Sequence, residues 1–191
     1  MSENLRRYTT IVFGLEHVVR LVPDSAWENA SPCAGCSARD VAGHAMGVVN
    51  NVAARAGVGE VIDVFSDDLG SIAGNDPLSA MRAIRDRYLE ATDRPGALRR
   101  QVTSRLGEMP LDQFLGAMCA DTLVHTWDIA RATGVDETLD PGSVSAVYAA
   151  YLVGFPATPR EPGRYGVEID PAGLETEQDR MIAFTGRDPR R

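Results

Sequence analysis

The sequence predicts an all-α protein that forms a single domain over residues 1–191. In several segments apolar residues recur every three or four positions, which is typical of helices that bury one face. The pairs Asp76-Pro77 and Asp140-Pro141 each combine a helix-capping residue with a proline suited to the first helical position. The 44% hydrophobic content is enough for a sizeable core, and the chain shows no internal repeat.

The first two predicted helices span residues 3–22 and 37–56. The first carries its apolar residues on one arc of the helical wheel and ends before Pro23. The second begins at Ser37, where Ser-Ala-Arg-Asp resembles a capping box with Asp40 in place of glutamate. Two glycines follow its last turn and stop it.

Residues 57–76 contain four glycines and several acidic residues, and we expect a mobile connection there. A third helix follows over residues 77–92, and residues 97–108 are ambiguous between an extended piece and the tail of a helix. The proline- and glycine-rich residues 156–166 predict an irregular crossing. The remaining predicted helices cover residues 110–133, 141–153 and 171–184.

The composition narrows the range of functions. All nineteen basic residues are arginine, and the absence of lysine excludes lysine Schiff-base chemistry and a phosphate-binding P-loop. A net charge of −8 without a basic run argues against nucleic acid or an anionic membrane as the partner. No apolar run suits a transmembrane helix, and the N-terminus does not resemble a signal peptide. We therefore expect a cytoplasmic protein that acts on a small molecule, and a homodimer is compatible with this.

The chain has only three histidines, and two of them fall on its first two predicted helices. His17 lies opposite the apolar arc of its helix, so we expect it on the surface. His44 shares the apolar stripe of its helix with Val48 and Asn51, because steps of three and four residues connect them. A lone inward histidine is more often a hydrogen-bonded core residue than a metal ligand, so His44 alone decides nothing.

The fourth long helix gives a stronger signal. Its inward stripe reads Phe114, Met118, Asp121, His125, so a carboxylate and an imidazole stand one turn apart on a face that should be buried. Burying a carboxylate costs several kcal/mol unless a partner compensates it. A divalent cation held by Asp121, His125 and His44 would compensate it, and so would a hydrogen-bonded pair without metal. The spacing leaves both interpretations open.

Cys33 and Cys36 form a C-x-x-C motif, which elsewhere marks a redox pair or half of a zinc site. No second pair accompanies it, no βαβ pattern surrounds it, and Cys119 lies far along the chain. An odd number of cysteines in a chain of this size favours free thiols in a reducing compartment.

Three segments carry a family resemblance. Residues 31–44 (SPCAGCSARDVAGH) resemble the opening of the DinB/YfiT-like superfamily, in the actinobacterial branch related to mycothiol-dependent maleylpyruvate isomerase. Residues 121–134 (DTLVHTWDIARATG) look like the second signature of that branch. Residues 179–189 (DRMIAFTGRDP) are similar to its usual C-terminus, so the resemblance covers essentially the whole chain.

The resemblance implies a DinB-like four-helix bundle with extra short C-terminal helices and a metal site with three protein ligands. The matching positions here are His44, Asp121 and His125, the same three that the helical stripes indicate. The ion implied is zinc or another divalent transition metal. It would activate a low-molecular-weight thiol, mycothiol in this branch, whose thiolate attacks an electrophilic carbon.

The sequence departs from the isomerase in three respects. Asp121 stands where the isomerase has glutamate, so we expect the ion closer to this helix. Cys36 stands where tryptophan is usual, which would bring a thiol into the wall beside His44. The separate C-terminal domain of the isomerase has no counterpart in the 191 residues, so we expect a reaction other than maleylpyruvate isomerisation.

These observations predict a metal-dependent enzyme, either a thiol transferase or a thiol-assisted isomerase or lyase acting on a small electrophile. Asp128 is expected to orient the metal ligands. Two alternatives stay open: a non-catalytic bundle that binds a ligand, and an enzyme of specialised metabolism that uses Asp121 and His125 as acid and base without a thiol. The expected pocket residues are Cys36, Val48, Asn51 and Met118.

Overall fold

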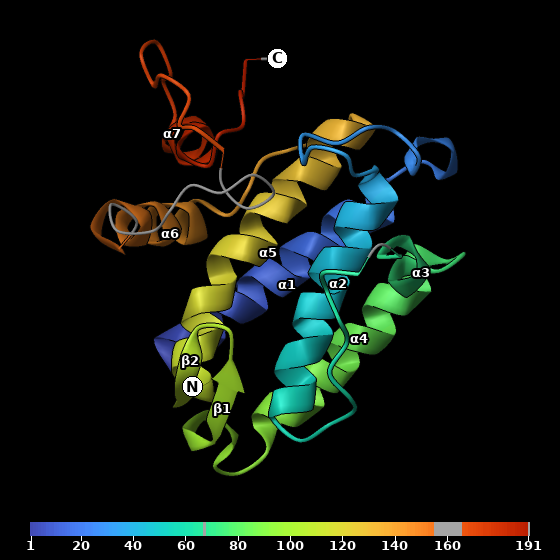
Figure 1. The fold of residues 1–191 in the computed structure, drawn as a ribbon, viewed down its shortest axis with the longest axis vertical. Coiled ribbons are helices and arrows are strands. Elements are labelled where there is room, and N and C mark those ends of the chain that lie inside the picture. The colour runs from blue at the N-terminus through green and yellow to red at the C-terminus, as the bar shows by residue number, and fades with distance from the viewer. Residues whose placement is uncertain (67, 155–165, 191) are drawn as a thin grey trace.

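The computed structural model describes residues 1–66, 68–154 and 166–190. Four long helices pack side by side as a bundle, which confirms the predicted all-α fold (Figure 1). Among the described residues, no helix combines the length and the apolar character needed to cross a membrane. The bundle helices are α1 (Glu3–Leu21), α2 (Ala38–Arg55), α4 (Pro77–Asp93) and α5 (Leu111–Thr133).

The starts of α2 and α4 confirm the predicted capping signals. The Ser37 hydroxyl accepts a hydrogen bond from the backbone N–H of Asp40, and the Asp40 carboxylate accepts one from the N–H of Ser37. Asp76 caps α4 by accepting from the N–H of Ser79, with Pro77 at the first helical position. Each cap satisfies N–H groups that the helix itself leaves without a partner.

The bundle contains a long crossover, which we define as residues 56–76. The helices α2 and α4 run in the same direction, whereas α1 and α5 run in the opposite direction (Figure 1). The crossover therefore returns the chain along the bundle between two parallel helices. It includes the one-turn helix α3 (Gly70–Ala73), which the sequence did not predict.

The crossover is tied to α2 and is not the loose connection that its composition predicts. The Asn51 side chain donates to the carbonyl of Ile62 at 2.8 Å and accepts from its N–H at 2.7 Å. The neighbouring Asn50 amide donates to the carbonyl of Glu60 at 2.9 Å. Buried amide side chains thus replace the hydrogen bonds that this irregular backbone lacks.

Two glycines of α2 allow the crossover to lie against the helix. A Cβ atom at Gly43 would lie 1.9 Å from the carbonyl oxygen of Leu69, and one at Gly47 would lie 2.7 Å from Val64 Cγ1. Both distances are shorter than non-bonded atoms tolerate, so side chains at these positions would push the crossover away.

The ambiguous residues 97–108 begin with a single 3-10 turn, η2 (Ala97–Arg99), and continue as an antiparallel hairpin. The hairpin pairs β1 (Gln101–Ser104) with β2 (Gly107–Pro110) at one end of the bundle (Figure 1). The extended alternative is therefore correct for most of this segment. The 3-10 turn and the hairpin together connect α4 to α5.

Two shorter helices lie to one side of the bundle, α6 (Pro141–Gly154) and α7 (Glu177–Phe184) (Figure 1). The prediction that the last helix begins at residue 171 is wrong. Gly173 adopts a φ of 81°, which interrupts a helix, and the Thr176 side chain caps α7 six residues later than expected. The predicted irregular crossing at residues 156–166 lies, apart from residue 166, outside the described residues.

We predict that Gly43→Ala lowers the free energy of unfolding by about 1–3 kcal/mol, because the new methyl group meets backbone atoms of Leu69. Gly14→Ala is the matched control, since Gly14 lies in the exposed middle of α1 with no atom within 4 Å of the new methyl group. That control should gain up to about 1 kcal/mol from helix propensity. Urea unfolding of both variants measures the difference. Equal effects of the two substitutions would contradict the close contact between α2 and the crossover.

Candidate metal centre

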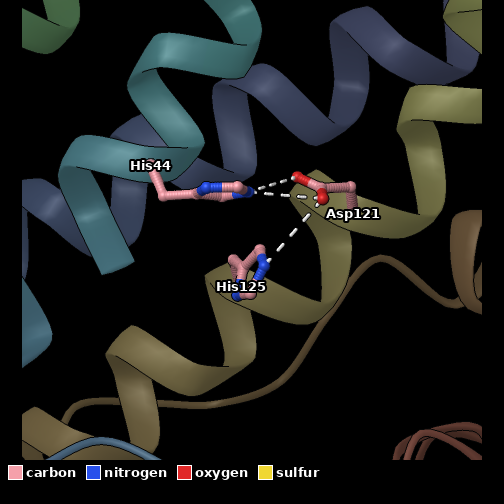
Figure 2. A group of neighbouring side chains, drawn as sticks. All are labelled: His44, Asp121 and His125. Atoms are coloured by element: carbon pink, nitrogen blue, oxygen red, sulfur yellow. Dashed lines mark hydrogen bonds and ion pairs between the residues drawn. The ribbon is translucent and has the colours of Figure 1, made fainter. Parts of the chain in front are cut away.

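The structure brings together the three residues that the helical stripes predicted. His44 from α2 and Asp121 and His125 from α5 point toward one another (Figure 2). One ligand atom from each lies within 4.8 Å of the other two. His44 Nε2 lies 3.3 and 3.4 Å from the carboxylate oxygens of Asp121, and His125 Nε2 lies 4.0 Å from the nearer one. At 4.0 Å the Asp121–His125 pair is not hydrogen-bonded, whereas His44 Nε2 lies within hydrogen-bonding distance of Asp121 Oδ2.

The outer nitrogen of each imidazole is occupied. His44 Nδ1–H donates to the carbonyl oxygen of Val64 in the crossover at 2.9 Å. His125 Nδ1–H donates to Asp128 Oδ2, also at 2.9 Å. A neutral imidazole with a proton on Nδ1 carries its lone pair on Nε2, and both Nε2 atoms face Asp121. Histidines that bind metals are commonly oriented in this way.

Asp128 is itself held by a buried guanidinium. Arg187 Nε donates to Asp128 Oδ1 at 2.6 Å, and Arg187 Nη2 donates to Oδ2 at 2.7 Å. The Asp128 side chain is fully buried and that of Arg187 is 8% exposed. Burial by itself raises the pKa of Asp128, but the hydrogen bond from His125 and the charge of Arg187 outweigh it, so its pKa lies below the ordinary value. A chain of contacts therefore runs from the C-terminal segment through Asp128 to His125.

The three central groups create an electrostatic problem. Burial lowers the pKa of His44, but the hydrogen bond and charge of Asp121 outweigh it and raise that pKa above its ordinary value. Asp121 Oδ1 is buried and lacks a hydrogen-bond donor in the described part of the chain. A proton on His44 Nε2 would donate to Asp121. Without that proton, the two imidazole lone pairs and the carboxylate repel unless a cation lies among them. Two histidines and one carboxylate form a common zinc donor set, so these residues fit a divalent metal ion.

A cavity of about 740 Å³ opens beside this centre. Val48, Asn51 and Met118 line it, as the sequence predicted. The amide of Asn51 donates to Ile62 and accepts from it, so this residue fixes the crossover. The apolar lining comes mainly from α5 and α6.

Cys36 does not line the cavity, contrary to the prediction. It lies in the turn before the capping residue of α2, where its N–H donates to the carbonyl of Cys33, and the two sulfur atoms are 3.6 Å apart. Both thiols are free, and so is that of Cys119. Burial, with the neighbouring Cys36, raises the pKa of Cys33 to about 12, so its thiol stays protonated at neutral pH. Such a thiol is a poor redox nucleophile.

Sequence reasoning missed four contributors to the site. Val64 and Arg187 act through contacts between distant parts of the chain, and no local pattern indicates such contacts. Phe65 places its ring 6.3 Å from the His44 ring, and Arg105 of the hairpin stacks over Phe65 at 3.9 Å. The crossover and the hairpin thus form one wall of the cavity.

Fold and site together define the class of the protein: a DinB-like helical bundle with a candidate three-residue metal centre between α2 and α5. Residues 12–130 match the mycothiol maleylpyruvate isomerase N-terminal domain, and the chain belongs to this family. The match contains all of α2 and α5 as far as residue 130, and therefore all three candidate ligands.

Two relatives are uncharacterized proteins of Mycobacterium tuberculosis, from strains CDC 1551 / Oshkosh and ATCC 25618 / H37Rv. Each is 36% identical over 95 residues, which is 49% of this chain and 52% of the relative. The chain thus matches about half the length of these relatives. A histidine-to-alanine mutant of the mycothiol-dependent maleylpyruvate isomerase has a similar fold, with a TM-score of 0.50 at 17% identity over 78% of this chain and 68% of that one.

We predict that Asp128→Asn lowers the free energy of unfolding by about 3–5 kcal/mol at neutral pH, because it leaves the Arg187 charge buried without its partner. In the wild-type protein this contribution is present above the ordinary carboxyl pKa of about 3.9. It is lost as the pH falls through the lower pKa that Asp128 has when folded. Urea unfolding over a series of pH values should therefore show a flatter acid limb for the variant.

The matched control for that experiment is Asp93→Asn, at an exposed position at the end of α4. Its effect should stay within about 0.5 kcal/mol. Equal stabilities of Asp128→Asn and the wild type at neutral pH would show that the buried pair does not hold the C-terminal segment.

Proposed function

We propose that this protein is a metal-dependent enzyme that uses a low-molecular-weight thiol, mycothiol or a close analogue, on a small electrophilic substrate. The observation that carries the proposal is the convergence of His44, Asp121 and His125 on one point in the wall of a large cavity. Family membership supports the use of a thiol. The reaction is either transfer of the thiol to the substrate or an isomerisation or elimination that the thiol assists.

His44, Asp121 and His125 would hold zinc or another divalent transition ion at the wall of the cavity. When bound, the ion lowers the pKa of a thiol beside it, so that thiolate is available near neutral pH. The residues of the chain orient and shield this chemistry. Val64 and Asp128 keep the two imidazoles turned inward, and the apolar residues of α5 and α6 that line the cavity limit the access of water.

We predict that the protein purified without chelator carries about one divalent transition ion per chain, measured by elemental analysis. His44→Ala and His125→Ala should each lower metal affinity at least about tenfold, whereas Asp121→Glu should retain binding. The matched control is His17→Ala, since His17 is exposed on α1 and contacts Arg20. Affinity should also fall toward acid pH, because protons compete for His44, whose pKa is raised. No stoichiometric metal and no uptake on titration would overturn the metal centre.

We predict that turnover of an electrophile requires both metal and thiol. The test compares four conditions on one preparation, with and without each component, for a panel of epoxides, activated alkenes and alkyl halides. The rate should rise with pH below neutrality, because protons compete with the ion for His44, whose pKa is raised. Turnover that needs metal but no thiol would support the thiol-independent enzyme. No turnover in any condition, despite bound metal, would leave the ligand-binding bundle as the better account.

A further inference from the structure

The cavity has a positive lining in an acidic protein. Its described lining residues include four arginines, and Asp121 is the single acidic residue among them, whereas the whole chain has a net charge of −8. Arg187 is neutralised by Asp128, and Arg7 forms an ion pair with Glu3. No carboxylate in the described part of the chain pairs with the other two, Arg55 and Arg105. A cleft lined by one sign of charge attracts ligands of the opposite sign.

Arg55 continues the α2 stripe that begins at His44. Steps of three and four residues connect His44, Val48, Asn51 and Arg55, and all four line the cavity. The eleven residues from His44 to Arg55 correspond to about 16 Å along the helix axis. Arg55 therefore marks the end of the cavity that lies three helical turns from the candidate metal ligands. Across from it, the ring of Phe114 on α5 lies 5.0 Å from the guanidinium carbon.

The guanidinium of Arg55 has an unused hydrogen-bonding edge. Nη1 donates to the carbonyl oxygen of Asn51 at 3.1 Å, a contact that suits a cation in the last turn of a helix. Nε is buried and lacks an acceptor among the described residues. The position of Arg55 in the last turn of α2 explains why Nη1 donates to a backbone carbonyl. It does not explain why Nε is buried without an acceptor. A buried donor without a partner is costly, and a ligand that supplies the acceptor removes that cost.

We infer that the Arg55 end of the cavity binds a carboxylate of the substrate. The Nε–Nη2 edge presents two N–H donors side by side, which match the two oxygens of a carboxylate. One guanidinium beside the apolar Phe114 ring suits a single negative charge. Arg105, exposed on the hairpin and stacked on Phe65, adds attraction at the cavity wall.

Together with the metal centre, the Arg55 site specifies an elongated substrate. This part of the inference rests on the proposed function. One end carries the carboxylate, and the other end, about three helical turns away, presents the reacting carbon to the metal-activated thiol. Between them, Val48 and Met118 line the cavity and suit an apolar middle section. Arg55 would select such a molecule over an uncharged one of the same length.

The test compares octanoate with octanamide, which share a chain length but differ in charge. Affinities are measured by calorimetry or ligand-observed NMR on zinc-loaded protein and again after chelation. Wild-type protein should bind octanoate at least about tenfold more tightly than octanamide, as expected for a charge-assisted paired hydrogen bond. Arg55→Gln should remove this preference and leave zinc affinity unchanged. Arg82→Gln, which removes an exposed arginine on α4, is the matched control and should keep the preference.

Three results would overturn the inference: equal binding of the two probes to wild-type protein, a preference that survives Arg55→Gln, and a preference that disappears on chelation. The last would place the carboxylate on the metal. Because the chelated protein is tested without thiol or metal, failure of the proposed chemistry would leave the Arg55 result readable. If Arg55→Gln does not fold, Arg55→Lys keeps the charge but loses the paired edge, and it should lower the preference at least about threefold. An unchanged preference in that variant also overturns the inference.

Discussion

Two imidazoles and a carboxylate on facing helices hold their acceptor atoms together only when the outer nitrogen of each ring has a fixed partner. In this protein the two partners come from different regions of the chain. Val64 belongs to the crossover between α2 and α4, and Asp128 belongs to α5 but is fixed by Arg187 beyond α7. Three features therefore support the same centre: the two glycines on α2, the two asparagines that hold the crossover, and the C-terminal segment.

This support of the centre explains why Arg187 is nearly buried, although it lies far along the sequence from its partner Asp128. Removing a carboxylate and a guanidinium from water is unfavourable, and apolar side chains of similar volume often stabilise a core as well or better. Asp128 also accepts from His125, so the ion pair does more than fill space. Arg55 shows a related pattern, because its unpartnered Nε is unfavourable for folding and favourable for binding an acceptor.

The sequence was informative wherever the determining interactions are local. Capping residues such as Ser37 and Asp76 fixed the helix starts, and helical spacing on two facing stripes was enough to single out His44, Asp121 and His125. It left the hairpin segment ambiguous and did not indicate α3 or the role of Arg187, because these features depend on contacts between distant segments. The late start of α7 and the position of Cys36 have local causes, a left-handed glycine and a tight turn, but helical periodicity does not report them.

The contact between His44 and the crossover has a consequence for dynamics. Any opening that detaches the crossover from α2 also breaks the hydrogen bond from His44 to Val64, so the segment and the imidazole orientation form one cooperative unit. A ligand that needs the oriented imidazole shifts this equilibrium toward the closed form by mass action. The Ile62 N–H donates a hydrogen bond to Asn51. The rate of amide hydrogen exchange at Ile62 therefore reports how much of the protein has a ligand bound at the centre.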